Sequence, residues 1–474
     1  MQQTFFFYDL ETSGLDPRRD RIMQFAGIRT DSSLEQIDEP VNLLIKLSDD
    51  VLPSPQAILV TGITPQATQA DGITEAEFCR YFLDEIMQEG TILLGYNNIA
   101  FDDEFVRYTL WRSFRDAYDW AYTKRCSRWD LLNVVRMVRA LRPKGINWPD
   151  KQVTDSDGNT ATRPTVNLVD MARSNGFTNE HAHDALSDVQ ATINLAKLIK
   201  SMQPKLWEYL LSHRNKMAVS NIVKPLLPFV ITSSRISQDY LNTSVVDALG
   251  SAGTPGSYVC WDLRHDPASF VKYNDDDIIA SLTERDEVLS KRGLERLPLL
   301  RVKLNACPIV APLGTLDPAS ETRIGLDKST VLKHHEAILK NRQLVERILR
   351  IYPQTRVFTP SNDVDGALYD GFLADMDKSR CRVVASSRPK DLVGLKLKFK
   401  DARLPALLLR YKARNYPQIL DEDERDTWDK YRAARLQRDL PEYLKQLNDL
   451  YQKGADDFIL QELQLWAESI LPSE

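Results

Sequence analysis

The chain opens with four consecutive aromatic residues, Phe5–Tyr8, inside the stretch TFFFYDLETSG. Side chains alternate between the two faces of a β-strand, so an unbroken aromatic run predicts a strand that is buried on both faces. Such a strand needs other elements to cover it on each side. The first two hundred residues provide them, because short apolar strands alternate there with helical stretches in the pattern of an α/β layer fold.

The local patterns predict where these elements lie. We expect strands at Thr4–Tyr8, Gln24–Thr30, Val41–Leu47 and Ile92–Tyr96. We expect helices at Glu75–Met87, Phe101–Phe114, Leu131–Leu141, Val166–Asn175 and Asp184–Met202. The segment Leu59–Pro65 is expected to be a short apolar stretch and a turn that contacts a ligand, and the polar insertion Asp150–Pro164 a hairpin or loop.

The length of 474 residues exceeds what one hydrophobic core usually serves, so two or three domains are expected. From about Pro228 to Ala311 the sequence is rich in β-branched residues, turns and prolines, which indicates a small barrel-like domain. A helix near Lys328–Ile351 is expected to close it. From Pro353 onward charged residues dominate at helical spacing, which predicts a mainly helical third domain.

The composition is that of an ordinary globular protein, with 43% hydrophobic and 27% charged residues. No apolar run approaches the roughly 18 residues of a membrane helix, and no secretory signal begins the chain, so we expect no membrane association. The five cysteines form no C-x-x-C pair, which favours free thiols in the cytoplasm. The net charge of −6 means that any basic surface for nucleic acid must be local.

Two carboxylates, Asp9 and Glu11, follow the aromatic run and should share one face of the strand. Two unit charges about 4 Å apart repel by roughly 4 kcal/mol at an effective dielectric of about 20. A basic side chain, a proton or a metal ion must therefore offset the repulsion. Either acid alone is a weak indication, because the end of any strand can carry one.

Further acids begin two of the expected helices. Asp102 and Asp103 follow GYNNIAF, and first-turn acids are common simply because they complement the positive helix terminus. Asp184 suits an N-cap, which places Asp188 one turn inside the helix beneath His183. A histidine in this position is by itself more typical of an ordinary surface residue than of a catalytic base.

Together the motifs are more specific. Asp-x-Glu, Asn-x-x-x-Asp and His-x-x-x-x-Asp occur in this order and resemble the three exonuclease motifs of the DEDD superfamily, in its histidine-bearing branch. The resemblance to the bacterial exonuclease I family extends over almost the whole chain. It is carried by GYNN-x-x-FDDE, SRWDLL, ALRPKGINWP, FTPSNDVDGALYDGF and YKARNYP.

This resemblance implies a fold of three domains. The first, at 1–203, is expected to be a ribonuclease H-like exonuclease domain of α/β class, with a mixed sheet flanked by helices. An SH3-like β-barrel domain is expected at 204–351, and a mainly α-helical C-terminal domain at 354–474.

It also implies the chemistry. Asp9, Glu11, Asp102 and Asp188 supply hard oxygen ligands, which suit two Mg²⁺ ions, or Mn²⁺, rather than zinc. Two ions about 4 Å apart would clamp a phosphodiester, one activating water and the other the leaving 3′-oxygen. Asp9 would bridge both ions, Asp102 the second, and Asp188 with Glu11 the first. His183 would accept the proton of the attacking water.

Binding of the strand is expected in a local basic region. Residues 107–144 contain ten basic residues and three acids, interleaved with seven aromatic residues. The alternative is that Trp111, Phe114 and Trp129 belong to the core and the arginines to a solvated helix face. The resemblance implies substrate contacts from Glu11, Thr12, Arg107, Tyr118, Tyr122, Arg136, Arg142 and Asn167. At Asn167 the family often carries a basic residue, so this contact departs from its pattern.

The resulting prediction is a monomeric 3′→5′ exonuclease that degrades single-stranded DNA to 5′-mononucleotides in repair and recombination. The family implies docking to single-stranded DNA-binding protein through the acidic tail of that protein. An exoribonuclease of the same superfamily is the near alternative, although its members are usually shorter. A catalytically inactive binding module is the other, disfavoured because all four acids and the histidine are present. A phosphatase with an Asp-x-Asp nucleophile is excluded, because Glu11 occupies the position of the second Asp.

Overall fold

The computed structural model describes residues 3–154, 158, 160–177, 184–356 and 358–471. The chain forms two compact units, each assembled from discontinuous segments. The first unit comprises Met1–Ser127, Glu180–Gln190 and Pro360–Glu474, and the second comprises Arg128–Asn179 and Ala191–Thr359. The N-terminal sheet and the C-terminal helices therefore belong to the same unit.

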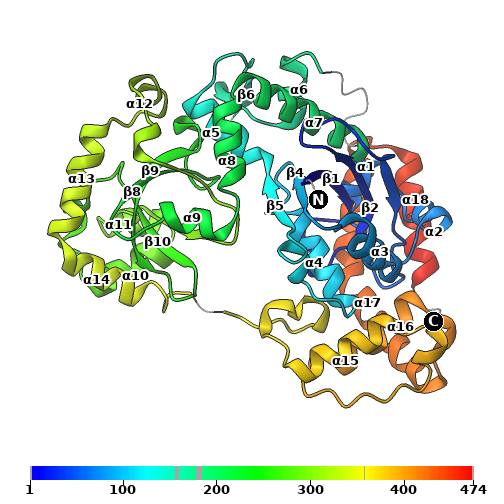
Figure 1. The fold of residues 1–474 in the computed structure, drawn as a ribbon. Helices are drawn as coiled ribbons and strands as arrows, with labels where there is room; N and C mark the ends of the chain where they lie inside the picture. The colour runs from blue at the N-terminus through cyan, green and yellow to red at the C-terminus, as the bar shows by residue number, and fades with distance from the viewer. Residues whose placement is uncertain (1–2, 155–157, 159, 178–183, 357, 472–474) are drawn as a thin grey trace. The chain divides into compact units, whose positions relative to one another are not determined.

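The sheet that contains the aromatic run is mixed and has the strand order β3-β2-β1-β4-β5 (Figure 1). β1 (Thr4–Thr12) pairs antiparallel with β2 (Ile22–Thr30) and parallel with β4 (Thr91–Gly95). β3 (Val41–Leu44) lies at one edge, and the chain leaves the first unit within β5 (Ser127–Asp130), a strand that the sequence did not predict. The side chains of Phe5–Tyr8 are all at most 3% exposed, which confirms the prediction of a strand buried on both faces.

The helices of the N-terminal part of this unit are short: α1 (Pro55–Thr61), α2 (Pro65–Asp71), α3 (Glu75–Tyr81) and α4 (Asp102–Arg112). The expected helix Glu75–Met87 is α3 continued by a π-helical turn, Phe82–Ile86. In Leu59–Pro65, the apolar residues form the last turn of α1 and the expected turn follows them. Gly62, with φ of 71°, ends that helix, and the side chain of Thr64 caps α2.

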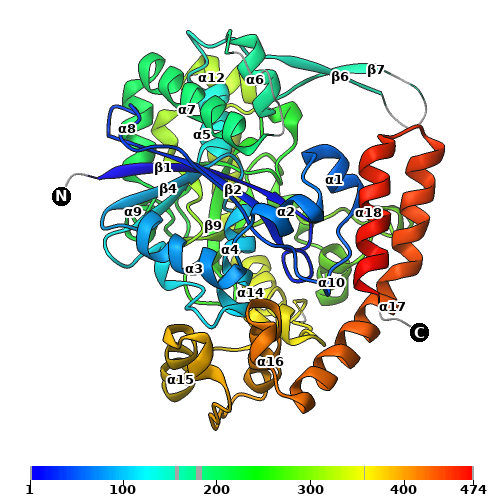
Figure 2. The same ribbon diagram turned by 90° about the vertical axis from the view of Figure 1, so that its right-hand side faces the viewer.

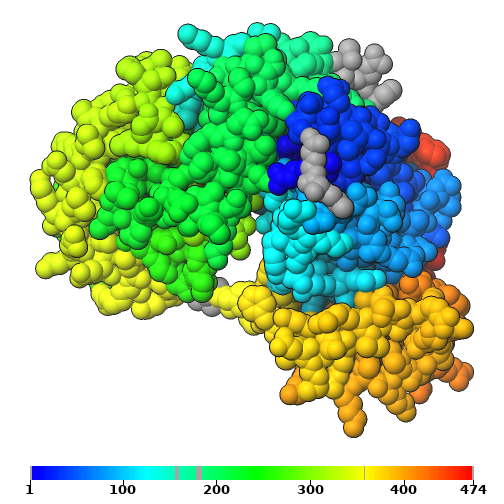
Figure 3. All heavy atoms as spheres, viewed as in Figure 1, coloured from blue at the N-terminus to red at the C-terminus, as the bar shows by residue number. Residues whose placement is uncertain are grey.

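The C-terminal part of the first unit is mainly helical, as predicted. Its helices are α15 (Asp375–Ser386), α16 (Arg403–Asn415), α17 (Glu422–Gln452) and α18 (Asp457–Ile470), preceded by a 3₁₀ segment, η6 (Val364–Asp370). Figure 2 shows α17 and α18 side by side, and in Figure 3 the orange residues of α15 and α16 pack without a visible gap against the cyan residues of the same unit.

These helices extend the core of the sheet, and beside it Ala413, Leu420 and Trp428 form a small cluster of their own. Leu407 and Tyr411 of α16 belong to the same buried cluster as Phe78 and Phe82. Leu463, Trp466 and Ile470 of α18 share a second cluster with Met23, Leu47 and Ile58. The stability of the sheet thus depends on segments more than three hundred residues away in the sequence.

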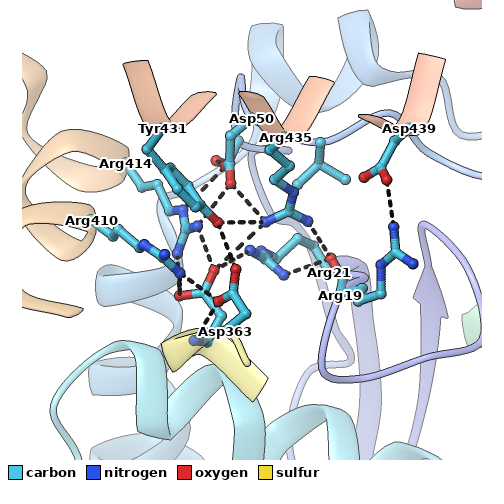
Figure 4. Close-up of polar contacts among 12 residues, drawn as sticks. Arg19, Arg21, Asp50, Asp363, Arg410, Arg414, Tyr431, Arg435 and Asp439 are labelled. Carbon is cyan, nitrogen blue, oxygen red and sulfur yellow. Dashed lines mark hydrogen bonds and ion pairs between the residues drawn. The ribbon is translucent and has the colours of Figure 1, made fainter. Parts of the chain in front are cut away.

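A buried ionic network also joins the two parts of the first unit (Figure 4). Arg414 of α16 contacts the carboxylates of Asp50 and Asp365 at 2.8 and 2.6 Å. Arg435 of α17 lies 2.8 Å from Asp50, and Arg21 lies 3.3 Å from Asp365. Both carboxylates are at most 1% exposed, so each depends on these guanidinium groups to remain ionised.

The second unit contains an antiparallel five-stranded sheet of order β11-β10-β9-β8-β12. Its strands are β8 (Pro228–Thr232), β9 (Thr243–Ser251), β10 (Ser257–Asp262), β11 (Leu299–Lys303) and β12 (Ile309–Pro312). The barrel-like region expected between Pro228 and Ala311 corresponds to this sheet. The single helix expected at Lys328–Ile351 is two helices, α13 (Lys328–Lys340) and α14 (Arg342–Ile351), which meet at Asn341.

The remaining elements of the second unit are mostly helical. α5 (Leu131–Leu141) has the predicted bounds, and the insertion forms the predicted hairpin of β6 (Asp150–Thr154) and β7 (Thr160–Pro164). The other helices are α6 (Leu168–Ser174), α7 (Ala185–Met202, which begins in the first unit), α8 (Pro204–Ser212), α9 (Lys216–Ile222), α10 (Asp275–Thr283), α11 (Asp286–Lys291) and α12 (Pro318–Ile324). Within the described ranges, none of the helices combines the length and apolarity needed to cross a bilayer.

Candidate active site

The candidate site begins at the end of β1. Asp9 pairs with Ala26 and Glu11 with Gln24 in the antiparallel ladder, so the two acids lie two residues apart on one face. Tyr8 and Leu10, which alternate with them, are buried in the core cluster on the other face. The strand therefore fixes the directions of both carboxylates through the packing of their neighbours.

Asp102 enters from the first residue of α4, after the turn that follows β4. Asn98 shapes this turn, because its side-chain oxygen accepts the N–H of Gly95 at 3.1 Å and its carbonyl accepts the N–H of Asp103 at 2.8 Å. Asn97 holds a left-handed backbone conformation with φ of 72°. Asp102 itself is only 4% exposed.

Asp188 lies in the first turn of α7. Asp184 precedes the helix and accepts the N–H of Ser187 at 3.0 Å with its side chain, as expected of an N-cap, and its carbonyl accepts the N–H of Asp188. The proposed base His183 lies outside the described residues.

The electrostatics show that the acids of the site act on Asp9 and Glu11. Burial raises the pKa of Asp9 well above its ordinary value. The negative charges of Asp102, Glu11 and Asp188, in that order, raise it further. Burial also raises the pKa of Glu11 to about 8, with additional contributions from Asp188 and Asp184. Carboxylates from β1, α4 and α7 thus converge in one region, where a divalent cation would remove the penalty for ionising them.

The donor set consists of carboxylate oxygens, which suit a hard divalent cation. Among the described residues, no three His, Cys, Asp or Glu side chains are gathered closely enough to hold one ion. Mg²⁺ commonly keeps several waters and takes only one or two carboxylates together with substrate phosphate oxygens. Water and substrate phosphate oxygens would therefore complete the coordination of an ion that these acids hold.

Thr12, the last residue of β1, is buried, and its hydroxyl donates to the carbonyl of Gly14 at 2.8 Å. The hydroxyl thus stabilises the turn after the strand, beside Glu11.

Aromatic and basic side chains of the first unit form a surface patch, which we define as Arg107, Tyr118, Tyr369 and Phe372. The guanidinium of Arg107 lies 5.8 Å from the centre of the Tyr118 ring. The Tyr118 ring lies 6.2 Å from Tyr369 and 6.0 Å from Phe372, whose side chain is 87% exposed. Tyr122 is also largely exposed, and its hydroxyl donates to Asp119.

Reasoning from the sequence missed Tyr369 and Phe372. They lie in the motif FTPSNDVDGALYDGF, which indicated the family but gave no sign of a binding role. The motif is far from residue 118 in the sequence, so the contact with Tyr118 could not be predicted. The core alternative was correct for Trp111, Phe114 and Trp129, which are at most 5% exposed.

Three other expected substrate contacts belong to the second unit. Arg136 donates to Asn133 at 2.9 Å. Arg142 pairs with Asp317 at 3.2 Å and donates to the carbonyl of Thr315. Asn167 is exposed and caps α6 by accepting the N–H of Val169 at 3.0 Å. All three already hold local structure, so a substrate contact would compete with these bonds or use their remaining donors.

A mixed sheet with paired acids on its central strand and further acids at the starts of two helices defines a nuclease of the ribonuclease H-like fold. Family models agree with this class: an exonuclease model matches residues 6–196, an exonuclease I SH3-like domain 214–354, and an exonuclease I C-terminal domain 362–470. Exodeoxyribonuclease I of Escherichia coli is 37% identical over 99% of this chain and 98% of its own length. The chain therefore belongs to the exonuclease I family.

Solved structures of E. coli exonuclease I resemble the whole chain. The complex with a dA16 oligonucleotide has a TM-score of 0.93 at 37% identity, covering 99% of this chain and all of that one. A zinc-bound complex with single-stranded DNA has a TM-score of 0.92 at 36% identity. An SSB/exonuclease I structure with the inhibitor CFAM has a TM-score of 0.89 at 35% identity. Both matches cover 99% of this chain and all of the solved chain. The exonuclease family requires divalent metal ions, and this chain is an exonuclease of that family.

Proposed function

We propose that this chain hydrolyses single-stranded DNA from its 3′ end and releases 5′-mononucleotides, with two Mg²⁺ ions that Mn²⁺ can replace. The observation that carries the proposal is the convergence of Asp9, Glu11, Asp102 and Asp188: besides burial, the charges of the other three raise the pKa of Asp9, and that of Asp188 raises the pKa of Glu11. Oxygen ligands alone favour Mg²⁺ or Mn²⁺ over softer metals. The relatives support DNA as the substrate, since the E. coli enzyme has been solved with single-stranded DNA.

The proposed roles follow from where each acid lies. Asp9 would hold both ions, Asp102 the second, and Glu11 with Asp188 the first. Bound divalent ions would supply a water of lowered pKa and neutralise charge on the leaving 3′-oxygen. His183 is proposed to accept the proton of the attacking water, because a neutral imidazole has a pKa near the working pH.

The aromatic patch is proposed to bind the strand in the first unit. Stacking of bases on Tyr118 and Phe372 is tolerant of sequence, and Arg107 would neutralise a phosphate. Thr12 and Tyr122 are proposed to contact the nucleotides there, and Arg136, Arg142 and Asn167 to contact the strand from the second unit. Arg142 supports such a role by its half-exposed guanidinium.

Three further parts of the prediction are retained as proposals. Docking to SSB through its acidic tail is supported by the SSB/exonuclease I structure, and a role in repair follows from the substrate. A cytoplasmic location is supported by five buried, free cysteines. Domain limits of 1–203, 204–351 and 354–474 are supported by the ranges of the family models.

The decisive experiment uses uniformly labelled single-stranded DNA with Mg²⁺, with EDTA, and with Asp9→Ala. We expect mononucleotide release only for the wild type with Mg²⁺. The matched control is Asp71→Ala, which removes an exposed acid at the end of α2. More than a tenth of wild-type turnover in Asp9→Ala would refute the shared-ligand assignment.

Changes to the substrate test the direction of digestion and the choice between DNA and RNA. A blocked 3′-hydroxyl should stop digestion, and cutting of a closed single-stranded circle would instead reveal an endonuclease. Faster digestion of an RNA oligonucleotide of the same sequence would favour the exoribonuclease alternative.

A further inference from the structure

A buried hydrogen bond lies directly behind the candidate site. The hydroxyl of Tyr8 donates to Oδ1 of Asp103 at 2.6 Å. Tyr8 is 2% exposed and Asp103 is fully buried. Tyr8 precedes Asp9 on β1, and Asp103 follows Asp102 on α4, so each partner of the bond is the chain neighbour of a candidate metal ligand.

The geometry makes this bond a link between two ligand-bearing elements. Tyr8 and Asp9 point to opposite faces of β1, so the tyrosine reaches through the core while its neighbour faces the site. The ring is fixed by stacking on Phe25 at 5.9 Å. Asp103 is fixed from its other side, since Asn98 donates to the same carboxylate oxygen at 3.4 Å and accepts the backbone N–H of Asp103.

Packing alone does not account for a carboxylate at this position. Burying an ionised group is unfavourable, and a buried polar pair can often be replaced by apolar residues without loss of stability. On the face of the sheet that holds Tyr8, the neighbouring side chains Phe6, Leu10 and Phe25 belong to the same core cluster. Asp103 lies in the first turn of α4, where an acid also complements the positive helix terminus. Its bond to the Tyr8 hydroxyl adds a tie between β1 and α4 that this role does not require.

We propose that Tyr8 and Asp103 are positioning residues: their hydrogen bond sets the separation of Asp9 from Asp102 and thereby the affinity of the site for its divalent ions. The inference rests on the proposed function, because it takes Asp9 and Asp102 as metal ligands. Residues that orient metal ligands typically change metal affinity about 10–100-fold when they are replaced.

The test measures binding of Mn²⁺ to the full chain by calorimetry, without DNA. Tyr8→Phe keeps the ring and removes the bond, and we expect Kd for Mn²⁺ to rise at least about tenfold. With DNA present, kcat should fall at low metal and recover at high metal, while KM for DNA stays unchanged. The matched control is Tyr443→Phe, which removes another buried tyrosine hydroxyl, one that donates to the carbonyl of Leu463 at 2.8 Å in the second core cluster. It should lower the melting temperature in EDTA but leave Mn²⁺ affinity unaltered.

Two more variants show whether Mn²⁺ affinity depends on the hydrogen bond itself, on the charge of Asp103, or on the stability of the fold. Asp103→Asn keeps an acceptor for the Tyr8 hydroxyl, so its Mn²⁺ affinity should stay within about threefold of the wild type, and a loss equal to that of Tyr8→Phe would overturn the assignment to the bond. Tyr8→Phe/Asp103→Leu removes both polar partners of the bond and is expected to fold more stably than Tyr8→Phe, yet to bind Mn²⁺ as weakly.

The outcomes distinguish the two levels of the proposal. Wild-type affinity in Tyr8→Phe or in the double variant would overturn the positioning inference alone. Absence of Mn²⁺ binding in the wild type would instead refute the proposed function.

Discussion

Asp365→Asn is the perturbation that most directly tests what holds the first unit together. The side chain of Asp365 accepts from both terminal nitrogens of Arg414, at 3.0 and 2.6 Å, and from Arg21 at 3.3 Å. The amide keeps the shape of the carboxylate but removes its charge, so guanidinium groups at most 4% exposed lose one of their counter-ions. Removing one partner of a buried pair typically costs about 3–5 kcal/mol.

Urea unfolding at pH 7 measures this loss. Hydrogen exchange of the β1 and α16 amides reports on the first unit separately, and both elements should lose protection together. The matched control is Asp426→Asn, which breaks an ion pair with Lys430 on the exposed face of α17, at 2.6 Å, and should change stability far less. A loss below about 1 kcal/mol for Asp365→Asn would refute the assignment of stability to the network.

The pH dependence gives an independent check of the same network. Burial alone would raise the pKa of Asp365, but the charges of Arg414 and Arg410 hold it well below its ordinary value. The stabilisation is therefore complete above the pKa of the unfolded carboxyl, about 3.9, and is lost as pH falls below it. The difference in free energy of unfolding between the wild type and Asp365→Asn should be constant above about pH 5 and narrow below about pH 4. A difference that widens in acid would contradict this sign.

Three further predictions concern the site. Tyr118→Ala and Phe372→Ala are each expected to weaken single-stranded DNA binding by about 1–3 kcal/mol per stacked base lost, measured by fluorescence anisotropy; an unchanged Kd would exclude these rings from the binding surface. His183→Ala is expected to lower kcat about 10²–10⁴-fold while calorimetric Mn²⁺ affinity is retained, and normal turnover per folded molecule would remove it from the mechanism. Because the folded protein raises the pKa of Glu11 from 4.5 to about 8, the metal-free protein should lose stability as pH rises through this interval, and Mn²⁺ affinity should increase as the proton is released. A pH-independent Mn²⁺ affinity between pH 5 and 8 would show that Glu11 is not a ligand.

Much of the fold could be predicted because its signals are local. The aromatic run Phe5–Tyr8 indicates a doubly covered strand without knowledge of its neighbours, and the apolar periodicity of Leu131–Leu141 gives the bounds of α5. The helices α1 and α2 could not be predicted in this way. They are seven residues long, begin at prolines and carry little periodicity, so their side-chain caps and their packing determine them.

The long-range partners of the sheet were not predictable from local patterns. Nothing near Phe78 or Met23 indicates that α16 and α18 complete their core clusters. The same is true of Asp50, whose counter-ions Arg414 and Arg435 lie more than 360 residues away. Charge and apolar content identify a helix as amphipathic, but they do not say which surface it covers.

The candidate site was predictable to the extent that its geometry is local. The period of two in a strand puts Asp9 and Glu11 on one face, and helix starts are natural positions for Asp102 and Asp188. The convergence of these three elements came from the family resemblance, not from spacing. Phe372 was missed because its partner Tyr118 is contributed by a different part of the sequence.

The alternation of β1 explains why the core and the site of this enzyme cannot vary independently. Successive residues of one strand serve opposite purposes, since Phe6 and Tyr8 pack into the core cluster while Asp9 and Glu11 face the acids of α4 and α7. Any repacking that tilts the strand moves both carboxylates together. Because the same cluster includes Tyr411 of α16, the C-terminal helices contribute to the rigidity of the site although they supply none of its four acids. A large, shared core is thus a physical requirement of chemistry that depends on the fixed separation of like charges.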